Sequence, residues 1–241
     1  MRYFIELSYN GKNYHGWQMQ PDAISVQEKI NDALSKVWQE TIEVVGAGRT
    51  DTGVHAKQMF AHFDVKSEAK EEIVYKLNSI LPNDIVVYKL FEVSSEKHAR
   101  FDAVSRSYEY KIWLGRNPFL LDFSWQIHSQ KLEIDSMNEA SKILLKYKDF
   151  QSFSKVKTDV YTYNCDIFEA EWKMNNEELT FYISANRFLR NMVRAIVGTM
   201  VDVGLGKISV SDFEEIIKSK NRSNAGLSVP ARGLFLTAIK Y

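Results

Sequence analysis

The sequence predicts an α+β protein with two halves, residues 1–103 and 104–241. Segments with strand-like alternation and segments with helical periodicity follow one another along the whole chain. A strand, a helix and further strands occur in this order in each half, which favours mainly antiparallel sheets flanked by helices. The halves share no readable sequence repeat, so their relationship is a hypothesis. With 241 residues and 45% apolar composition, the chain can bury a substantial core.

The first half begins with RYFIELSY at 2–9, whose alternation predicts a strand. Ser25 and Glu28 have the S-x-x-E spacing of a capping box, which predicts that a helix begins there. The apolar stripe of this helix consists of Val26, Ile30, Ala33, Leu34 and Val37. Further strands are predicted over 41–45, 58–65 and 85–93, and a helix over 71–81.

The second half begins with a predicted strand over 105–115 and ends with one over 233–241. Residues 165–185 are typical of a β-hairpin that turns at Asn175-Asn176. Helices are predicted over 135–147, with Asp135 as the N-terminal cap, over 187–205 and over 211–219.

Composition excludes several kinds of site. Lys plus Arg equals Asp plus Glu, 31 against 31, so a nucleic-acid partner would need a local basic surface. Cys165 is the single cysteine, which excludes a disulfide framework and a thiolate zinc site, and we interpret it as a small buried side chain. The N-terminus lacks the apolar run of a signal peptide, and no segment reaches the length of a membrane span. We therefore expect a soluble, cytoplasmic protein that does not associate with membranes.

The glycine-rich segment GAGRTDTGVH at 46–55 follows a predicted strand but fits neither common phosphate-binding motif. It has no Gly-Lys pair, and Asp51 stands where a dinucleotide fingerprint needs its third glycine. Two interpretations remain: a tight turn with Asp51 bonded to nearby amides, or a positioned, ionised carboxylate. Arg49 and Asp51 are two residues apart, so in extended backbone they project to the same side.

Seven ordered blocks of the chain together resemble one family. They are YNGKNYHGWQMQ at 9–20, SVQEKI at 25–30, GAGRTDTGVHA at 46–56, LNSILPNDIVV at 77–87, KHARFDAVSRSYEY at 97–110, RFLRNMVRAIVG at 187–198 and VPARGLFL at 229–236. In order and spacing they are similar to the tRNA pseudouridine synthase A family, from end to end of the chain. The resemblance implies the pseudouridine synthase fold and a homodimer.

The activity that the resemblance implies is isomerisation of uridine in the anticodon stem-loop of tRNA, at family positions 38–40. The glycosidic C–N bond breaks, the uracil rotates, and C5 is joined to the sugar. Asp51 corresponds to the family nucleophile; attack on uracil C6 and attack on sugar C1′ both remain open. No cofactor or metal is expected, because the reaction is redox-neutral and hydrolyses nothing. The same chemistry on a broader RNA target set, and a non-catalytic tRNA-binding module, are the alternatives.

The resemblance also implies roles for residues outside the glycine-rich segment. Tyr108 matches a tyrosine that lies against the target base, and Arg49 a residue that assists base extrusion. Arg194 is expected to pair with the catalytic aspartate, and Leu234 to pack beneath the active site. Without the resemblance, Tyr108 would be interpreted as an ordinary strand residue and Arg49 as part of a structural salt bridge to Asp51. Arg194 would be interpreted as part of a solvated helix face, and Leu234 as a core residue.

Basic residues concentrate in two segments of this neutral protein. Residues 97–116 carry a net charge of +3, and Arg187, Arg190 and Arg194, expected on one side of a helix, add three more. The family pattern places RNA contacts at KHARF, that is at Lys97, His98, Ala99, Arg100 and Phe101. Lys97 departs from that pattern, which often has an aromatic residue there. Lys155 and Lys157 are weaker candidates, because residues 155–164 match the family loosely.

Overall fold

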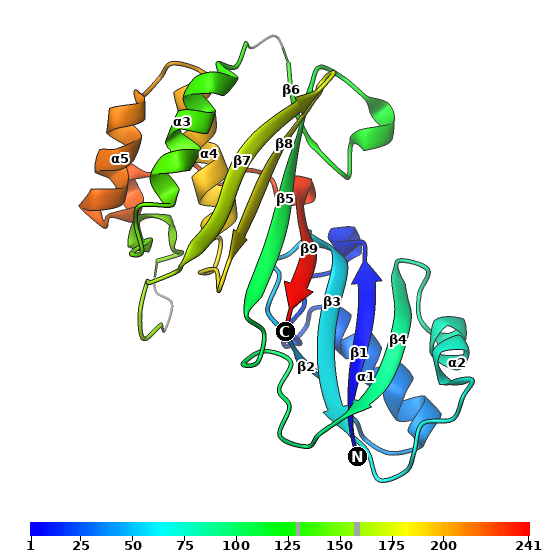
Figure 1. Cartoon of the computed structure of the whole chain (residues 1–241). Helices are drawn as coiled ribbons and strands as arrows, with labels where there is room; N and C mark the ends of the chain where they lie inside the picture. The colour runs from blue at the N-terminus through cyan, green and yellow to red at the C-terminus, as the bar shows by residue number, and fades with distance from the viewer. Residues whose placement is uncertain (129–130, 157–159) are drawn as a thin grey trace. The chain divides into compact units, whose positions relative to one another are not determined.

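The computed structural model describes residues 1–128, 131–156 and 160–241 of the chain. These residues form two compact units (Figure 1). Unit 1 contains Met1–Val104 and Phe235–Tyr241, and unit 2 contains Ser105–Leu234. The division expected from sequence placed residues 104–241 together, whereas in the structure the chain returns to unit 1 after Leu234.

Unit 1 is built on a sheet with the strand order β4-β1-β3-β9. The strands are β1 (Arg2–Tyr9), β2 (Val45–Gly46), β3 (His55–Asp64), β4 (Ile85–Val93) and β9 (Leu234–Lys240). β1 pairs with β3 and β4 in antiparallel fashion, β2 pairs with β3, and β9 joins β3 in parallel through two residue pairs. Tyr3, Ile5, Leu7 and Tyr9, which alternate along β1, are buried and form part of the core of this unit.

Helices α1 (Val26–Trp38) and α2 (Ile73–Ile80) contact each other, and α1 lies behind the strands in Figure 1. The predicted capping box is confirmed, because Ser25 accepts a hydrogen bond from the Glu28 amide and Glu28 accepts one from the Ser25 amide. Most of the predicted stripe is fully buried, and Val37 is partly buried. Sequence periodicity therefore located both the start and the buried face of α1.

The strand predicted over 41–45 is wrong for most of its length, because only Val45 belongs to β2. Ile42 and Val44 are buried as their pattern suggests. Their amides, however, donate to side chains of α1: Ile42 to Ser35 and Val44 to Asn31, each at 2.9 Å. Helix side chains satisfy this backbone in place of a neighbouring strand.

Unit 2 has the strand order β5-β8-β7, with β6 parallel to β5. The strands are β5 (Ser105–Leu114), β6 (Trp125–Ile127), β7 (Ile167–Asn175) and β8 (Glu178–Ala185). β7 and β8 form the predicted hairpin, but Asn175 already pairs with Glu178. The turn is therefore Asn176-Glu177, one residue later than expected, with Asn176 at a φ of +53°.

Helices α3 (Ile134–Leu144), α4 (Met192–Gly204) and α5 (Val210–Ser219) lie on the same face of the unit 2 sheet (Figure 1). The expected cap at Asp135 is wrong: this residue lies in the first turn of α3, after Glu133. The expected start of α4 at residue 187 is also wrong. Asn191 adopts a left-handed conformation, with a φ of +66°, and the helix begins after it. Arg187 and Arg190 precede α4 and do not share a helix side with Arg194.

Five short 3₁₀ helices complete the described structure: η1 (Gly11–Asn13), η2 (Pro118–Leu120), η3 (Gln151–Phe153), η4 (Arg222–Asn224) and η5 (Ala231–Gly233). The predicted α+β class, with mainly antiparallel sheets flanked by helices, is confirmed. None of the helices that the structure describes is long and apolar enough to cross a membrane.

Candidate active site

Residues 46–55, here called the Asp51 loop, connect β2 to β3 in unit 1. Burial alternates at its centre: Arg49 is exposed, Thr50 is buried and Asp51 is partly buried. Gly53 has a φ of +77°, which allows the chain to turn directly after Asp51. The loop thus holds a carboxylate partly out of solvent, with a guanidinium group in the exposed position two residues before it.

The Asp51 loop packs backbone-to-backbone against the motif YNGKNYHGW at residues 9–17. A Cβ atom built on Gly11 would lie 2.0 Å from the Val54 carbonyl oxygen, and one on Gly16 would lie 2.4 Å from that of Thr50. Only glycine permits such approaches, and Gly16 also has a φ of +93°. By contrast, a Cβ on Gly48 would meet no atom within 4 Å.

Hydrogen bonds fix the same contact. Within this contact the Trp17 amide donates to the Thr50 carbonyl at 3.2 Å, and the Gly53 amide donates to the Tyr14 carbonyl at 3.3 Å. The hydroxyls of Tyr9 and Thr50 are 2.8 Å apart and share a hydrogen bond. The residues on both sides of Asp51 are therefore bonded to the motif.

Tyr14 connects the motif to Asp84, directly before β4. Its hydroxyl donates to one carboxylate oxygen of Asp84, and the Asn13 side chain donates to the other at 3.0 Å. Burial, together with this bond and the charge of Asp84, raises the pKa of Tyr14, so the phenol stays protonated. The support of the Asp51 loop thus extends to the LPND segment at 81–84.

His55 begins β3 and is 2% exposed. Its Nδ1 accepts a hydrogen bond from the Gly11 amide at 3.1 Å, and its ring stacks on Phe235 of β9 with a centroid distance of 4.7 Å. The Lys57 ammonium group lies over the Phe235 ring, 5.7 Å from its centroid. At the end of the Asp51 loop, the imidazole therefore links β3, the 9–17 motif and β9.

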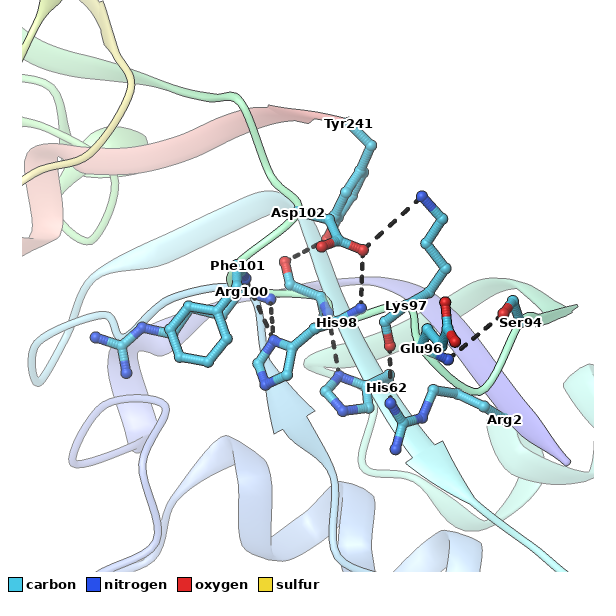
Figure 2. A network of polar contacts seen from close by, with 11 residues as sticks. Arg2, His62, Ser94, Glu96, Lys97, His98, Arg100, Phe101, Asp102 and Tyr241 are labelled. Carbon is cyan, nitrogen blue, oxygen red and sulfur yellow. Dashed lines mark hydrogen bonds and ion pairs between the residues drawn. The ribbon is translucent and has the colours of Figure 1, made fainter.

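The KHARF residues, Lys97, His98, Ala99, Arg100 and Phe101, form a second loop of unit 1 between β4 and β5 (Figure 2). We call residues 97–102 the KHARF loop. Ala99 is fully buried, and its amide donates to Nδ1 of His62 at 3.1 Å while its carbonyl accepts from the Tyr241 hydroxyl at 2.8 Å. The side chains of Lys97, Arg100 and Phe101 are exposed, and Phe101 is 75% exposed.

His98 organises the exposed part of the KHARF loop. Its Nδ1 accepts from the amides of Arg100 and Phe101 at 3.1 and 3.2 Å, and its ring lies 4.2 Å from that of Phe101. The Asp102 carboxylate accepts from the His98 amide at 3.0 Å and lies 3.9 Å from the Lys97 ammonium. Figure 2 shows the Arg100 side chain next to the Phe101 ring.

The start of β1 also supports the KHARF loop. Arg2 donates to the Lys97 carbonyl at 2.9 Å and forms a two-point ion pair with Asp64, with bonds of 2.9 and 2.7 Å. Burial, His98 and Arg2 lower the pKa of His62 from 6.5 to about 4. His62 is therefore neutral at physiological pH and can accept the Ala99 amide.

Unit 2 contains the other expected site residues. Tyr108 lies in β5 opposite Ile183 of β8, is partly buried, and meets Phe188 edge-on with a centroid distance of 5.2 Å. Arg194 lies in the first turn of α4, and its Nε donates to the Val229 carbonyl at 2.7 Å. Leu234 is 6% exposed at the start of β9.

The segment before Leu234 is fixed to β5 and α4. The Val229 amide donates to the Arg194 carbonyl at 3.3 Å, and the Tyr110 hydroxyl donates to the Pro230 carbonyl at 2.9 Å. Burial raises the pKa of the Tyr110 hydroxyl, and this effect outweighs the positive charge of Arg194, which acts to lower it. A Cβ on Gly233 would lie 2.8 Å from the Tyr110 ring. The conformation of VPARGL is thus set by the residues around Arg194.

The structure brings Arg49 and Asp51 together in one loop, and it holds all five KHARF residues in another. It assigns Tyr108, Arg194 and Leu234 to unit 2, and their expected meeting with Asp51 stays a prediction. Of the weaker RNA candidates, Lys155 is exposed and its amide donates to the Arg190 carbonyl at 3.0 Å. Lys157 lies outside the described residues.

Other polar groups bear on what the site can bind. Cys165 is buried as interpreted, and burial raises the pKa of its thiol to about 11. Within the part of the chain that the structure describes, no three His, Cys, Asp or Glu side chains gather as metal ligands.

Sequence reasoning missed His62, Tyr14, Asp84 and Tyr241 as supports of the two loops. The recognised blocks offered a signal for Tyr14, in the block at 9–20, and for Asp84, in the block at 77–87, but none for His62 and Tyr241.

Comparison with known proteins shows which family this chain is similar to. A family model described as tRNA pseudouridine synthase matches residues 7–102 and 140–241. The tRNA pseudouridine synthase A of Bacteroides fragilis is 50% identical over 243 residues, which cover 100% of this chain and 96% of the relative. The protein of the same name from Porphyromonas gingivalis is 48% identical, covering 100% and 97%. That from Bacillus licheniformis is 39% identical, covering 100% and 99%.

Proposed function

The chain belongs to the tRNA pseudouridine synthase family, and from this premise we propose that it modifies uridines of the anticodon stem-loop with Asp51 as its nucleophile. As a member of this family, it is an isomerase that converts uridine in tRNA to pseudouridine. The observation that carries the proposal is the mounting of the Asp51 loop, in which the residues flanking the carboxylate are bonded to the 9–17 motif.

A held carboxylate suits this reaction because a covalent adduct divides a difficult bond exchange into easier steps. Asp51 would bond to the nucleoside, the N1–C1′ bond would break, and the uracil would rotate within the site. A bond from C5 to C1′ would then form, C5 would lose its proton while N1 gains one, and Asp51 would be released. Partial burial reduces the number of water molecules that compete for the adduct.

Arg49 is proposed to assist extrusion of the target base. A uridine in a stem-loop must leave its stack before the carboxylate can reach it, at a cost of a few kcal/mol. The exposed guanidinium two residues before Asp51 can occupy the vacated space, stack on neighbouring bases and bond phosphate. Exposure of Arg49 beside a buried Thr50 supports this role, because the side chain is available to RNA.

The unit 2 residues are proposed to complete the site. Tyr108 would stack on the extruded uracil, and stacking of one base on an aromatic ring contributes about 1–3 kcal/mol. Arg194 would pair with the Asp51 carboxylate, and Leu234 would pack beneath the base. The bond from Arg194 Nε to the Val229 carbonyl supports this role, because it fixes the orientation of the guanidinium group in the first turn of α4.

The exposed Lys97, Arg100 and Phe101 side chains are proposed to contact the tRNA, which supplies both phosphates and bases for such groups. We further propose that the protein acts as a homodimer in the cytoplasm, where one subunit could hold the tRNA body and the other the anticodon arm. A mass measurement in solution at micromolar concentration tests the dimer, and a monomer mass would contradict it.

The test of the nucleophile is to incubate the protein with unmodified tRNA and map pseudouridines by base-resolved chemical labelling. Asp51→Asn and Asp51→Ala are each expected to lower the rate by about 10³-fold or more, because neither side chain can form the adduct. A variant that works at the wild-type rate would exclude Asp51 as the nucleophile. Formation of pseudouridine only at positions outside the anticodon arm would contradict the proposed target.

The test of base extrusion is Arg49→Ala. We expect strongly reduced turnover with tRNA binding mostly kept, because the missing group acts after the complex has formed. A tRNA in which the target uridine faces a mismatch should recover part of the rate, since less stacking and pairing must be broken. Lost binding combined with normal single-turnover chemistry would refute the role.

A further inference from the structure

Strand β3 contains two buried histidines that support different loops in the same way. His55 accepts the Gly11 amide at Nδ1 and His62 accepts the Ala99 amide at Nδ1, both at 3.1 Å. The first bond lies next to the Asp51 loop, whereas the second lies under the KHARF loop. Their exposed fractions are 2% and 4%, so solvent competes with neither bond.

Both bonds require a defined state of the ring. An imidazole nitrogen that accepts an N–H bond carries no proton, so each neutral ring must carry its proton on Nε2. Protonation of Nδ1 would place its N–H opposite the N–H of the backbone amide, and the hydrogen bond between them would be lost. A leucine of similar size would fill the space but leave the amide without an acceptor, which is unfavourable inside a protein.

His98 extends this support to the loop surface. Its ring contacts that of His62 edge-on, with centroids 4.6 Å apart (Figure 2). Its own Nδ1 accepts the next two amides, those of Arg100 and Phe101. Three successive amides of the KHARF loop thus donate to two imidazole rings that contact each other edge-on. The directions of the Arg100 and Phe101 side chains depend on that backbone.

The side chains held in this way form a surface suited to an unpaired nucleotide. Phe101 is packed on His98 on one side and is 75% exposed, so most of its ring is accessible. The Arg100 guanidinium carbon lies 5.7 Å from the centre of the same ring. An aromatic ring beside a guanidinium can stack on a base and bind its phosphate at the same time.

We propose that His62 and His98 are positioning residues of tRNA binding, which hold Arg100 and Phe101 in the orientation that contacts an unpaired nucleotide and its phosphate. This inference rests on the proposed function, since tRNA is the ligand. It assigns to His62 a role in tRNA affinity, and to the equivalent bond of His55 a role in the chemical step. The two histidines provide a matched pair for its test.

The experiment measures the Kd of unmodified tRNA at several salt concentrations and the single-turnover rate at saturating protein. His62→Leu should raise Kd by about 10-fold and lower the slope of log Kd against log salt by about one unit, as Arg100→Ala should, because one phosphate contact is lost. The single-turnover rate should stay within about 2-fold of wild type. His62→Asn, which keeps an acceptor near the Nδ1 position, should restore most of the affinity.

His55→Leu is the matched control, and we expect the reverse: a lower single-turnover rate with Kd and salt slope unchanged. In a background carrying Arg100→Ala and Phe101→Ala, His62→Leu should have no further effect on Kd, because its effect passes through those residues. An additive loss in that background, or an unchanged salt slope for His62→Leu, would overturn the inference.

Folding of each variant is checked by thermal unfolding. If His62→Leu does not fold, His98→Leu at its partly buried position tests the same proposal, with the same expected changes in Kd and salt slope. These outcomes are separate from those for Asp51. Absence of pseudouridine formation by the wild-type protein would refute the proposed function. The inference depends instead on whether the Kd for tRNA and its salt dependence change together in the His62 variants.

Discussion

The Asp51 loop and the KHARF loop each lie next to a buried histidine of β3, but their supports differ: His55 accepts an amide of the 9–17 motif, whereas His62 accepts an amide of the KHARF loop itself. The Asp51 loop rests on backbone: Gly11 and Gly16 bring the chain of the 9–17 motif into contact with the carbonyl groups on both sides of Asp51. The KHARF loop rests on side chains, since the rings of His62 and His98 accept its amides.

This difference matches what each loop has to do. A nucleophile must be held to within a fraction of an ångström, and backbone packed on backbone has few alternative arrangements. A surface that meets RNA must instead expose large side chains, and the two imidazole rings hold the backbone that carries them. The comparison predicts that changes under the first loop affect rate and changes under the second affect affinity.

The largest effect is expected for Gly11→Ala, which should lower the single-turnover rate by about 10²-fold. The new methyl group must displace the Val54 carbonyl and with it the end of the Asp51 loop. Gly48→Ala is the matched control within the same loop, because its methyl group would meet no atom. Single-turnover rates and tRNA Kd for both variants check this. A large rise in Kd for Gly11→Ala would break the division between the two loops.

An intermediate effect is expected from the pH dependence of stability. The unfolded His62 side chain binds a proton as pH falls below about 6.5, whereas the folded one stays neutral until about pH 4, so acid favours unfolding. Proton uptake by His62 in the unfolded state should lower the free energy of unfolding by about 1–2 kcal/mol as the pH falls from 6.5 to 4.5. Urea unfolding across that range measures it.

His62→Asn provides the control for this pH dependence, since asparagine does not titrate. Its unfolding free energy should fall less steeply than that of wild type over the same range. Equal slopes for the two proteins would show that His62 is not held neutral, and would remove one physical basis for the fixed KHARF loop.

The smallest effect is expected for Ser25→Ala, which removes the cap of α1 and should lower stability by about 1 kcal/mol. The first amides of α1 donate to the carbonyls of Gly16 and Trp17, so this helix end also holds the motif behind Asp51. A slightly lower rate with unchanged tRNA Kd is expected. Urea unfolding and single-turnover assays measure both, and a change in Kd alone would contradict the comparison.

Much of the fold could be predicted from local pattern. Alternation located β1 and β4 to the residue, and the Ser25–Glu28 spacing located the start of α1. Pattern failed where contacts distant in sequence decide the structure. Residues 41–44 resemble a strand but bond to α1 side chains. Asn191 ends the preceding segment by a backbone conformation that helical periodicity does not encode.

The site was predicted unevenly for a similar reason. Charge and glycine content marked Asp51 and Arg49 as unusual, and the resemblance supplied their roles. The supports of the Asp51 loop and of the KHARF loop are contacts between segments far apart in sequence, such as Gly11 with Val54 and His62 with Ala99. A histidine within an apolar strand is more often a core residue, so only the fold distinguishes His62 from an ordinary one.

Unit 1 is assembled from two parts of the chain that are synthesised at different times. The ring that stacks on His55 belongs to Phe235, and the hydroxyl that bonds Ala99 belongs to Tyr241. Both follow the whole of unit 2 in the order of translation. A nascent chain can fold the first strands of unit 1 early, but neither loop gains its final partner until unit 2 has emerged. Maturation of the two functional loops is thereby delayed until the rest of the sequence needed for catalysis has been made.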